Sequence, residues 1–411
     1  MKRTITYLFL LTLLIACSVS IQAQEPRVVR MSASTMGGSR IDTPEGTTTF
    51  PFELISNHIV LPVEINGSIT KLILDTGMPI EGAILFGSEE IDKLNLSYVG
   101  KAPIMGAGGT TVEADLAMDI NFKLPGASFS GQMVMVMPFD ADRYNYHERK
   151  NGIIGSSLFR HFVVSIDYDN MKITLTNPEQ FSYTGNGEAI PLEIARYPML
   201  KCETEMESGA KVPLNLVIDI GNSDALTLNV GSAEAIILPN KTIETYKVSL
   251  KNEIPVHIGR VKEFRIGGFH FKNVLCSFST QTPPPWSKEG NLGQGILERF
   301  NVTFDYSRQV MYLEPSDQFN DPFDVNMAGI SFLRTENGLF RITRVFPDSP
   351  AADAGLKQGD LLKTIDDQIV TAVTKDEAYR LLQKKCGQEV TLEVLRNGST
   401  LKVVISLRRL I

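Results

Sequence analysis

The sequence predicts a mostly β protein in which two lobes repeat one β unit and a smaller α+β domain follows. Short apolar strands separated by turns run from Phe50 to about residue 316. Segments of this region recur in the same order, and from about residue 325 strands alternate with two helix signals. A chain of 411 residues is too long for one ordinary core, so two or three domains are expected.

The composition is that of a folded protein, with 43% hydrophobic and 21% charged residues. The formal net charge is −7, and no basic stripe is present. Nucleic-acid binding is therefore not expected, because it needs a clustered positive surface.

The N-terminus has the pattern of an export signal, predicted over residues 1–23. Lys2 and Arg3 precede an apolar run, Ile5–Ala16, that is too short to span a bilayer. Two processing sites compete: Leu14–Cys17 resembles a lipobox, which would leave Cys17 lipid-modified, and Ala23 fits an ordinary cleavage site. The protein is expected in the periplasm or cell envelope, either free or as an outer-membrane lipoprotein whose only membrane attachment is the lipid.

The first strands follow a polar segment. Residues 24–48 are rich in Gly, Ser and Thr and are predicted to form a flexible arm. Ile59–Ile65 is apolar with partial alternation, Asn66-Gly67 is a strong hairpin signal because both residues tolerate positive φ, and Leu72–Leu74 continues as the next strand.

The internal repeat predicts two lobes, residues 49–184 and 185–316, whose matched loops meet where the lobes join. Repeated matches in one order are not expected by chance. The matching pairs of segments are Leu72–Gly77 with Leu216–Gly221, Gly155–Phe162 with Gly293–Phe300, and Ser165–Tyr168 with Thr303–Tyr306.

The C-terminal domain has clear local signals. Ser349 can cap a short helix that Pro350 begins and Gly355 ends. Thr374–Glu377 is a capping box that opens a second helix. Asn397-Gly398 predicts the turn of a closing hairpin.

On these residues, 325–411 resembles a PDZ domain, and Ser349–Asp360 is the most specific part of the match. The resemblance implies that an extended peptide adds to a strand beside a helix. It places the loop that binds a peptide carboxylate at Gly329, Ile330, Ser331 and Phe332. An alternative is that the domain braces the chain with an empty groove.

Each repeat places one aspartate, Asp75 or Asp219, at a strand end before a Gly turn. Two carboxyls brought together share one proton, because like charges so close cannot both ionise cheaply. Such a pair can activate water against a carbonyl group. Gly lets the backbone pass close beneath the carboxyls.

This arrangement resembles the aspartic-peptidase clan, and specifically bacterial aspartyl protease–PDZ proteins, over about residues 50–411. The resemblance implies an exported endopeptidase that acts on peptides or proteins without a metal or organic cofactor. Asp75 and Asp219 become the catalytic pair. The supporting residues are Thr76, Gly77, Gly155, Gly221, Asn222, Ser223 and Gly293, and the flap carries Gly106, Gly108 and Gly109.

Three positions depart from the family pattern. Ile220 replaces the second Thr, so one half of a cross-lobe hydrogen-bond pair is missing; Met78 stands where a small residue is common; and Asn291 replaces an apolar residue. Two alternatives to the enzyme therefore stay open: a pseudo-peptidase that binds peptides without cutting them, and an envelope scaffold.

Few other residues suggest chemistry. Cys202 and Cys276 fall in one lobe and can either pair or serve as small buried residues. Trp286 follows three prolines, and it can line a substrate subsite or pack within its loop. The five histidines show no paired metal-binding spacing, so no metal site is predicted.

Overall fold

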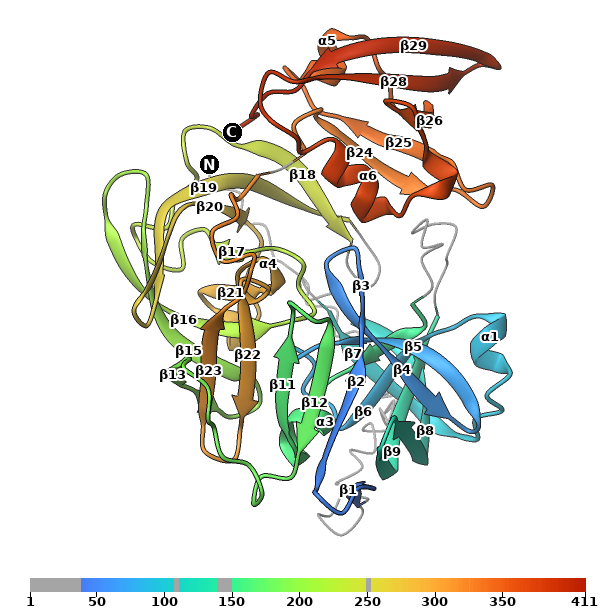
Figure 1. Ribbon diagram of the computed structural model, residues 1–411, viewed down its shortest axis with the longest axis vertical. Helices are drawn as coiled ribbons and strands as arrows, with labels where there is room; N and C mark the ends of the chain where they lie inside the picture. The colour runs from blue at the N-terminus through green and yellow to red at the C-terminus, as the bar shows by residue number, and fades with distance from the viewer. Residues whose placement is uncertain (1–37, 107–110, 139–149, 249–252, 325) are drawn as a thin grey trace, which may run out of the picture. The chain divides into compact units, whose positions relative to one another are not determined.

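The computed structural model describes residues 38–106, 111–138, 150–248, 253–324 and 326–411 (Figure 1). The expected signal peptide with Cys17, and the flap residues Gly108 and Gly109, lie outside these ranges. The described chain is mostly β, as predicted, and its strands form four sheets. None of its helices combines the length and apolar character that a membrane span requires.

The first predicted hairpin is present. β4 (His58–Ile65) and β5 (Ser68–Leu74) pair in antiparallel fashion. Their turn has φ of 49° at Asn66 and 80° at Gly67. Both residue types accept positive φ, so the two-residue turn sets the register of the strands.

Strands of the first repeat close into a ring. The pairing order is β9-β6-β10-β5-β4-β8, and β8 pairs with β9 to complete it, while β7 adds to β8 outside the ring. Closure leaves no free edge within the ring. The remaining bounds are β6 Gly82–Phe86, β7 Tyr98–Met105, β8 Thr111–Leu124, β9 Ala127–Met137 and β10 Gly152–Ile154.

The second repeat forms a sheet with the same sequence of parallel and antiparallel pairings. Its order is β20-β17-β21-β16-β15-β19, closed by β19 on β20, with β18 added to β19. The repeat seen in the sequence is thus also a repeat of strand pairing. The bounds are β15 Pro198–Glu205, β16 Lys211–Asp219, β17 Leu226–Asn229, β18 Ile243–Val248, β19 Glu253–Ile266, β20 Phe269–Ser279 and β21 Gly290–Gly293.

A third sheet joins the two repeats. β11 (Val163–Asp167) pairs antiparallel with β22 (Phe300–Asp305), and Ser165 lies opposite Thr303. The Thr303 hydroxyl donates to the Ser165 hydroxyl at 2.9 Å. These two residues are matched by the sequence repeat, so each copy pairs with its own counterpart, which is the relation that a two-fold axis creates.

The flexible arm expected over residues 24–48 is not seen where the structure describes it. β1 (Ser39–Ile41) pairs with β9, and β2 (Thr47–Pro51) pairs with β12 (Lys172–Thr176). The run of threonines favours an extended strand, and Ile41 and Phe50 are buried. Polar composition alone had suggested a loop.

Short elements complete the two repeats. β23 (Val310–Pro315) lies between β22 and β13 (Glu188–Pro191) in the third sheet, while β3 (Glu53–Ile55) pairs with β4 and β14 (Glu193–Ile194) with β15. The helical turns are α1 Glu89–Asp92, α3 Ser156–His161, η3 Pro285–Ser287 and α4 Gln294–Leu297.

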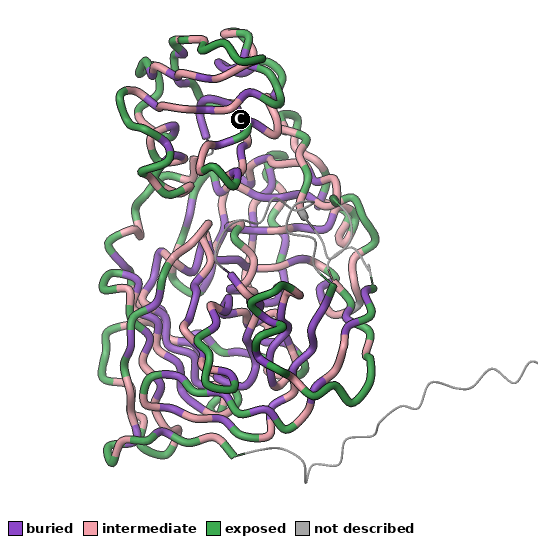
Figure 2. The backbone as a smooth tube through the Cα atoms, turned by 90° about the vertical axis from the view of Figure 1, so that its right-hand side faces the viewer, coloured by how far each residue is buried: buried purple, intermediate pink, exposed green. Residues whose placement is uncertain are grey.

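Both repeats share one apolar core, which runs from Ile41 to Leu313. Strands of the three sheets that the two repeats form carry buried residues, and Figure 2 marks the buried parts of the backbone in purple. Phe159 of the first repeat meets Phe304 of the second edge to face, with ring centroids 5.4 Å apart. A common core means that the two repeats fold as one body.

The C-terminal region has its own core and sheet. Its strands are ordered β24-β25-β26-β28-β29, which leaves β24 at an edge. Ser349 caps α5, and Thr374 with Glu377 forms the predicted capping box of α6. The bounds are β24 Ile330–Arg334, β25 Phe340–Val345, α5 Pro350–Asp353, β26 Leu361–Ile365, β27 Gln368–Ile369, η4 Val370–Ala372, α6 Lys375–Leu381, β28 Glu389–Arg396 and β29 Ser399–Ser406.

The shared core makes a testable prediction. Phe304→Ala is expected to lower the free energy of unfolding by about 3–5 kcal/mol, because it opens a cavity where the repeats meet. Chemical denaturation followed by circular dichroism measures the change. Lys172→Ala, on the exposed side of β12, is the control and should shift stability by no more than about 0.5 kcal/mol. Equal effects of the two substitutions would contradict a joint core.

Candidate active site

The carboxyl groups of Asp75 and Asp219 are hydrogen-bonded to each other. Glycines make this approach feasible. A Cβ added to Gly77 would lie 2.8 Å from Asp219 Oδ1, and one added to Gly221 would lie 2.4 Å from Asp75 Cγ. Any other residue would collide with the pair, so both predicted glycines are needed by the geometry.

Equivalent strands hold the two loops. The backbone N–H of Asp75 donates to Ile154 at the end of β10, and Asp219 lies beside Gly293 at the end of β21. A Cβ on Gly155 would lie 2.2 Å from the Asp75 carbonyl oxygen, and one on Gly293 would lie 2.3 Å from that of Asp224. Gly155 and Gly293 therefore pack closely against the loops, as expected.

Thr76 joins the two loops. Its hydroxyl donates to the Ile218 carbonyl at 2.7 Å and accepts from the Ile220 N–H at 3.0 Å. Both the side chain of Ile220 and Thr76 are buried. Because Ile220 has no hydroxyl, the bracing runs in one direction only, as the sequence predicted.

The apolar replacements do not separate the carboxyls. Ile220 belongs to the main core, and Met78 packs in a separate apolar cluster with Ile84, Ile104 and Met135. Asp75 and Asp219 keep their mutual hydrogen bond and some accessible surface. Water can therefore reach the pair.

The surroundings split the pKa values of the two carboxyls. Burial raises the pKa of Asp75 well above its usual range, and the charge of Asp219 raises it further. The Gly77 N–H, which donates to Asp75 Oδ1 at 2.6 Å, lowers this pKa. Burial also raises the pKa of Asp219, but hydrogen bonds from Asp75 and Asn291 and the charge of Lys247 oppose it. Burial thus raises both pKa values, and the donors on Asp219 favour its charged form, so the two carboxyls can share one proton.

Asn291 is the residue whose role the sequence analysis missed. Its Nδ2 donates to Asp219 Oδ2 at 2.7 Å. The Ser287 hydroxyl donates to Asn291 Oδ1, and this fixes which end of the amide faces Asp219. In sequence Asn291 was only a departure from an apolar pattern; a polar residue in an otherwise apolar segment was the available signal.

Asn222 and Ser223 assist less directly than expected. The Asn222 N–H donates to the backbone carbonyl of Asp219 at 3.1 Å, whereas its side chain donates to Thr227. Ser223 is exposed, and its carbonyl accepts from Asn57 Nδ2 at 3.0 Å. The support they give comes through the backbone.

A hairpin also reaches the site from the second repeat. β18 and β19 occupy the place in the pairing order that β7 and β8 occupy in the first. Lys247 of β18 forms an ion pair with Asp224 and donates to Thr227 at 3.1 Å. The sequence predicted a flap only in the first repeat, where Gly106 follows β7.

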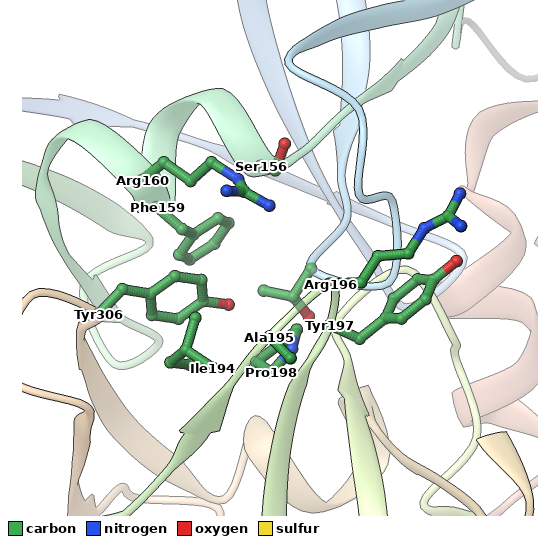
Figure 3. A pocket seen from close by; sticks show the side chains of 10 residues that line it. Ser156, Phe159, Arg160, Ile194, Ala195, Arg196, Tyr197, Pro198 and Tyr306 are labelled. Atoms are coloured by element: carbon green, nitrogen blue, oxygen red, sulfur yellow. The ribbon is translucent and has the colours of Figure 1, made fainter. Parts of the chain in front are cut away.

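Thr76 is one of the residues that line a small pocket of about 10 Å³, which Figure 3 shows from close by. The Ser156 and Tyr306 hydroxyls that border it are buried and have no partner among the described residues. At the symmetry-related place, Tyr168 of the first repeat donates to Gln294 of the second at 3.1 Å. The shorter Ser156 leaves a space that fits one water molecule.

Among the described residues, the cysteines and the other potential ligands form no further site. Cys202 and Cys276 are free thiols, so the pairing left open by the sequence is absent, and burial raises the pKa of both. Over the ranges that the structure describes, no group of three or more His, Cys, Asp or Glu side chains could hold a metal ion.

Comparison with known proteins identifies the C-terminal domain. Residues 327–407 match the PDZ domain family. No curated protein matches the chain. A PDZ domain is a peptide-binding module, so binding of peptide or protein ligands is supported for this part of the chain.

The edge strand β24 is the element of this domain that is open to a peptide. Phe332 of β24 stacks on Tyr379 of α6 with centroids 4.4 Å apart, and Ile330 is buried. The N–H of Gly329 donates to Asn326, so it is not available to a carboxylate. Carboxylate binding by the backbone of the predicted loop, Gly329, Ile330, Ser331 and Phe332, stays a prediction.

Replacing the bridging hydroxyl should loosen the two loops. Thr76→Val leaves the Ile218 carbonyl and the Ile220 N–H buried without a partner, which is expected to cost about 1–3 kcal/mol of unfolding free energy. Thr76→Ser keeps the hydroxyl and should retain most of the stability. Chemical denaturation of both variants checks this, and equal losses would show that the methyl group matters rather than the bridge.

The raised pKa of Asp75 predicts how stability depends on pH. A folded state that keeps a proton that the unfolded state has already lost becomes less stable as pH rises from about 4 through the folded pKa. Asp75→Asn removes this loss, so its stability relative to the parent should increase from pH 4 to pH 8. Denaturation at several pH values measures the difference. The exposed Asp119→Asn is the control, and a pH-independent difference for Asp75→Asn would contradict the prediction.

Proposed function

We propose that this protein is an exported aspartic-type endopeptidase. The observation that carries the proposal is the mutual hydrogen bond of Asp75 and Asp219, with an Asn291 donor on Asp219 and burial that raises the pKa of both carboxyls. Paired carboxyls that share one proton can act as base and acid in a single step.

Each residue then has a defined task. Asp219 takes a proton from a water molecule as the water oxygen bonds to the carbonyl carbon of the peptide. Asp75 gives its proton to the carbonyl oxygen, which yields a neutral tetrahedral diol. The diol then returns a proton to Asp75, the carboxyl product forms, and Asp219 passes its proton to the leaving nitrogen as the C–N bond breaks. Asp75 ends protonated and Asp219 charged, as they began.

The architecture supports the same proposal. Both repeats use one pattern of strand pairing, and each presents its aspartate beside the end of an equivalent strand. The hairpins β7–β8 and β18–β19 are placed alike in the two sheets and are suited to cover a bound peptide. Thr76 fixes the spacing between the loops, and positioning at this level strongly affects rate.

The termini complete the proposal. The N-terminal sequence directs export to the periplasm or cell envelope, with Cys17 as the lipid-attachment site if the lipobox is used. The PDZ domain recruits peptide segments along β24, and this raises the local concentration of substrate.

Ile220 favours a second candidate function. With the bracing from Thr76 alone, the pair has less support than two reciprocal threonines would give. A pseudo-peptidase that binds peptides in the same place and does not cut them is the alternative.

Cleavage of a mixed peptide library by purified residues 24–411, read by mass spectrometry from acidic to neutral pH, tests the proposal. We expect cutting by the parent and loss of at least about 1,000-fold in rate for Asp75→Asn and for Asp219→Asn, because neither can share the proton. Asp119→Asn should cut like the parent. A folded parent that binds peptides and cuts none would establish the pseudo-peptidase.

The dependence of cleavage on pH should show whether the hydrogen bond from Asn291 lowers the pKa of Asp219. Activity is lost on the acid side when Asp219 takes up a proton. Asn291→Leu removes a donor to the charged carboxylate, so the pKa of Asp219 rises and the acid limb of kcat/KM moves to higher pH. Asn222→Ala, which removes an amide that does not touch the carboxylate, should leave the limb in place. If the acid limb of kcat/KM lies at the same pH in the parent, Asn291→Leu and Asn222→Ala, this role for Asn291 is excluded.

A further inference from the structure

Asp219 lies on one face of the sheet of the second repeat, and other residues of β16 extend that face. Along β16, Leu216 and Ile218 point into the core, so Asn215, Val217 and Asp219 lie on the opposite face. Met199 of β15 pairs with Val217. Continuing that antiparallel register by two residues brings Tyr197, just before β15, opposite Asp219.

A pocket of about 310 Å³ lies along this face. It is large enough for a long side chain of a bound peptide. Trp286, which the sequence left undecided between subsite and loop packing, forms one wall. The other residues that matter here are Arg196, Tyr197, Met199, Asn215 and Lys288.

Arg196 is held over an aromatic surface. Tyr197 and Trp286 are stacked, with centroids 5.6 Å apart and planes 16° from parallel. The Arg196 guanidinium lies 5.7 Å from the Tyr197 centroid and 5.8 Å from that of Trp286. In Figure 3, Arg196 and Tyr197 extend together, away from Phe159 and Tyr306. Contact with two rings restrains the guanidinium and leaves its N–H groups available.

The charge of the pocket is positive and unpaired. Arg196 and Lys288 are exposed, and neither forms an ion pair within the described ranges. Glu289, the one acidic residue in the lining, accepts from the Asn215 N–H.

The pocket is near the paired carboxyls. Burial raises the pKa of the Tyr197 hydroxyl, Arg196 lowers it, and the charges of Asp75 and Asp219 raise it further. Tyr197 therefore lies within electrostatic reach of both aspartates and of Arg196. A peptide bound across the aspartates can place a neighbouring residue in the pocket.

We infer that this pocket, with Arg196 over Tyr197 and Trp286, is a specificity subsite for a carboxylate of the bound peptide. The carboxylate pairs with the guanidinium, and the methylenes of the ligand lie on the aromatic rings. Two sources supply this chemistry: a Glu or Asp side chain near the scissile bond, or the C-terminal carboxylate of a short substrate. The inference rests on the proposed function for its role in cleavage, and on the pocket alone for binding.

At the matching positions of the first repeat, Val60 and Lys71 stand in place of Met199 and Asn215, and the Lys71 ammonium is paired with Glu53. The two sides of the site thus differ in chemistry, so the carboxylate preference is confined to one side of the scissile bond.

The test uses pairs of peptides that differ only by Glu or Gln at each position near the cut, all with amidated C-termini so that the PDZ domain has no terminal carboxylate to bind. A second set compares free and amidated C-termini on short peptides. The proteins are the parent, Arg196→Ala, Arg196→Glu and the control Lys172→Ala, with folding checked by circular dichroism. Relative kcat/KM is read by mass spectrometry.

At one position on one side of the cut, the parent is expected to prefer Glu over Gln by about 10- to 100-fold, as a charge-assisted hydrogen bond implies. Arg196→Ala should abolish the preference, Arg196→Glu should prefer Lys, and Lys172→Ala should keep it. If instead the free C-terminus is the preferred carboxylate, Arg196→Ala will remove that preference. A Glu/Gln ratio and a free/amide ratio that Arg196→Ala leaves unchanged would overturn the inference.

A binding measurement separates this inference from the proposed function. Calorimetry with the Asp75→Asn protein compares the same peptides with and without Arg196→Ala. If no protein cuts but the carboxylate preference in binding depends on Arg196, the peptidase proposal fails and the subsite stands. If the parent cuts and neither cleavage nor binding responds to Arg196, the subsite fails and the peptidase stands.

Discussion

Pairing of β11 with β22 is the constraint on which the rest of the two-repeat body depends. Ser165 lies opposite Thr303, so each copy of the repeated unit meets its counterpart. Once that register is set, the short segments before these strands, and the loops that they pack against, approach from opposite sides. Asp75 and Asp219, far apart in the chain, then become neighbours, with glycines beneath them because no side chain fits.

The two repeats share the same strand pairing, but the residues around Asp75 and Asp219 differ. The strand pairings of the two sheets match, yet Thr76 corresponds to Ile220, Ser156 to Gln294, and an apolar residue of the first repeat to Asn291. These differences give the two carboxyls unequal surroundings. Asp219 receives a hydrogen bond from Asn291 and the field of Lys247, whereas Asp75 is stabilised mainly by backbone N–H groups. Unequal surroundings are what allow one shared proton to have a preferred place.

The structure of the C-terminal domain depends mainly on local interactions. Its core is separate, its helix starts are set by local caps, and its edge strand β24 pairs with a described strand on one side only. Because caps and tight turns act within a few residues, this was the domain that the sequence described most completely, and its family match agrees.

Local chemistry and repetition were readable from the sequence by itself: the Asn66-Gly67 hairpin, the capping box at Thr374, the mostly β class and the two candidate aspartates. Only the tertiary structure decided what surrounds the aspartates. Asn291 of β21 donates to Asp219, and Lys247 of β18 acts on Asp219 through its charge while it pairs with Asp224. Arg196 meets Trp286 because the segment before β15 and η3 border one pocket. The strands near Ser39 and Thr47 were missed for the same reason, since their partners β9 and β12 lie far away in sequence. Hydrogen bonds and electric fields depend on distance in space, which a pattern along the chain does not record.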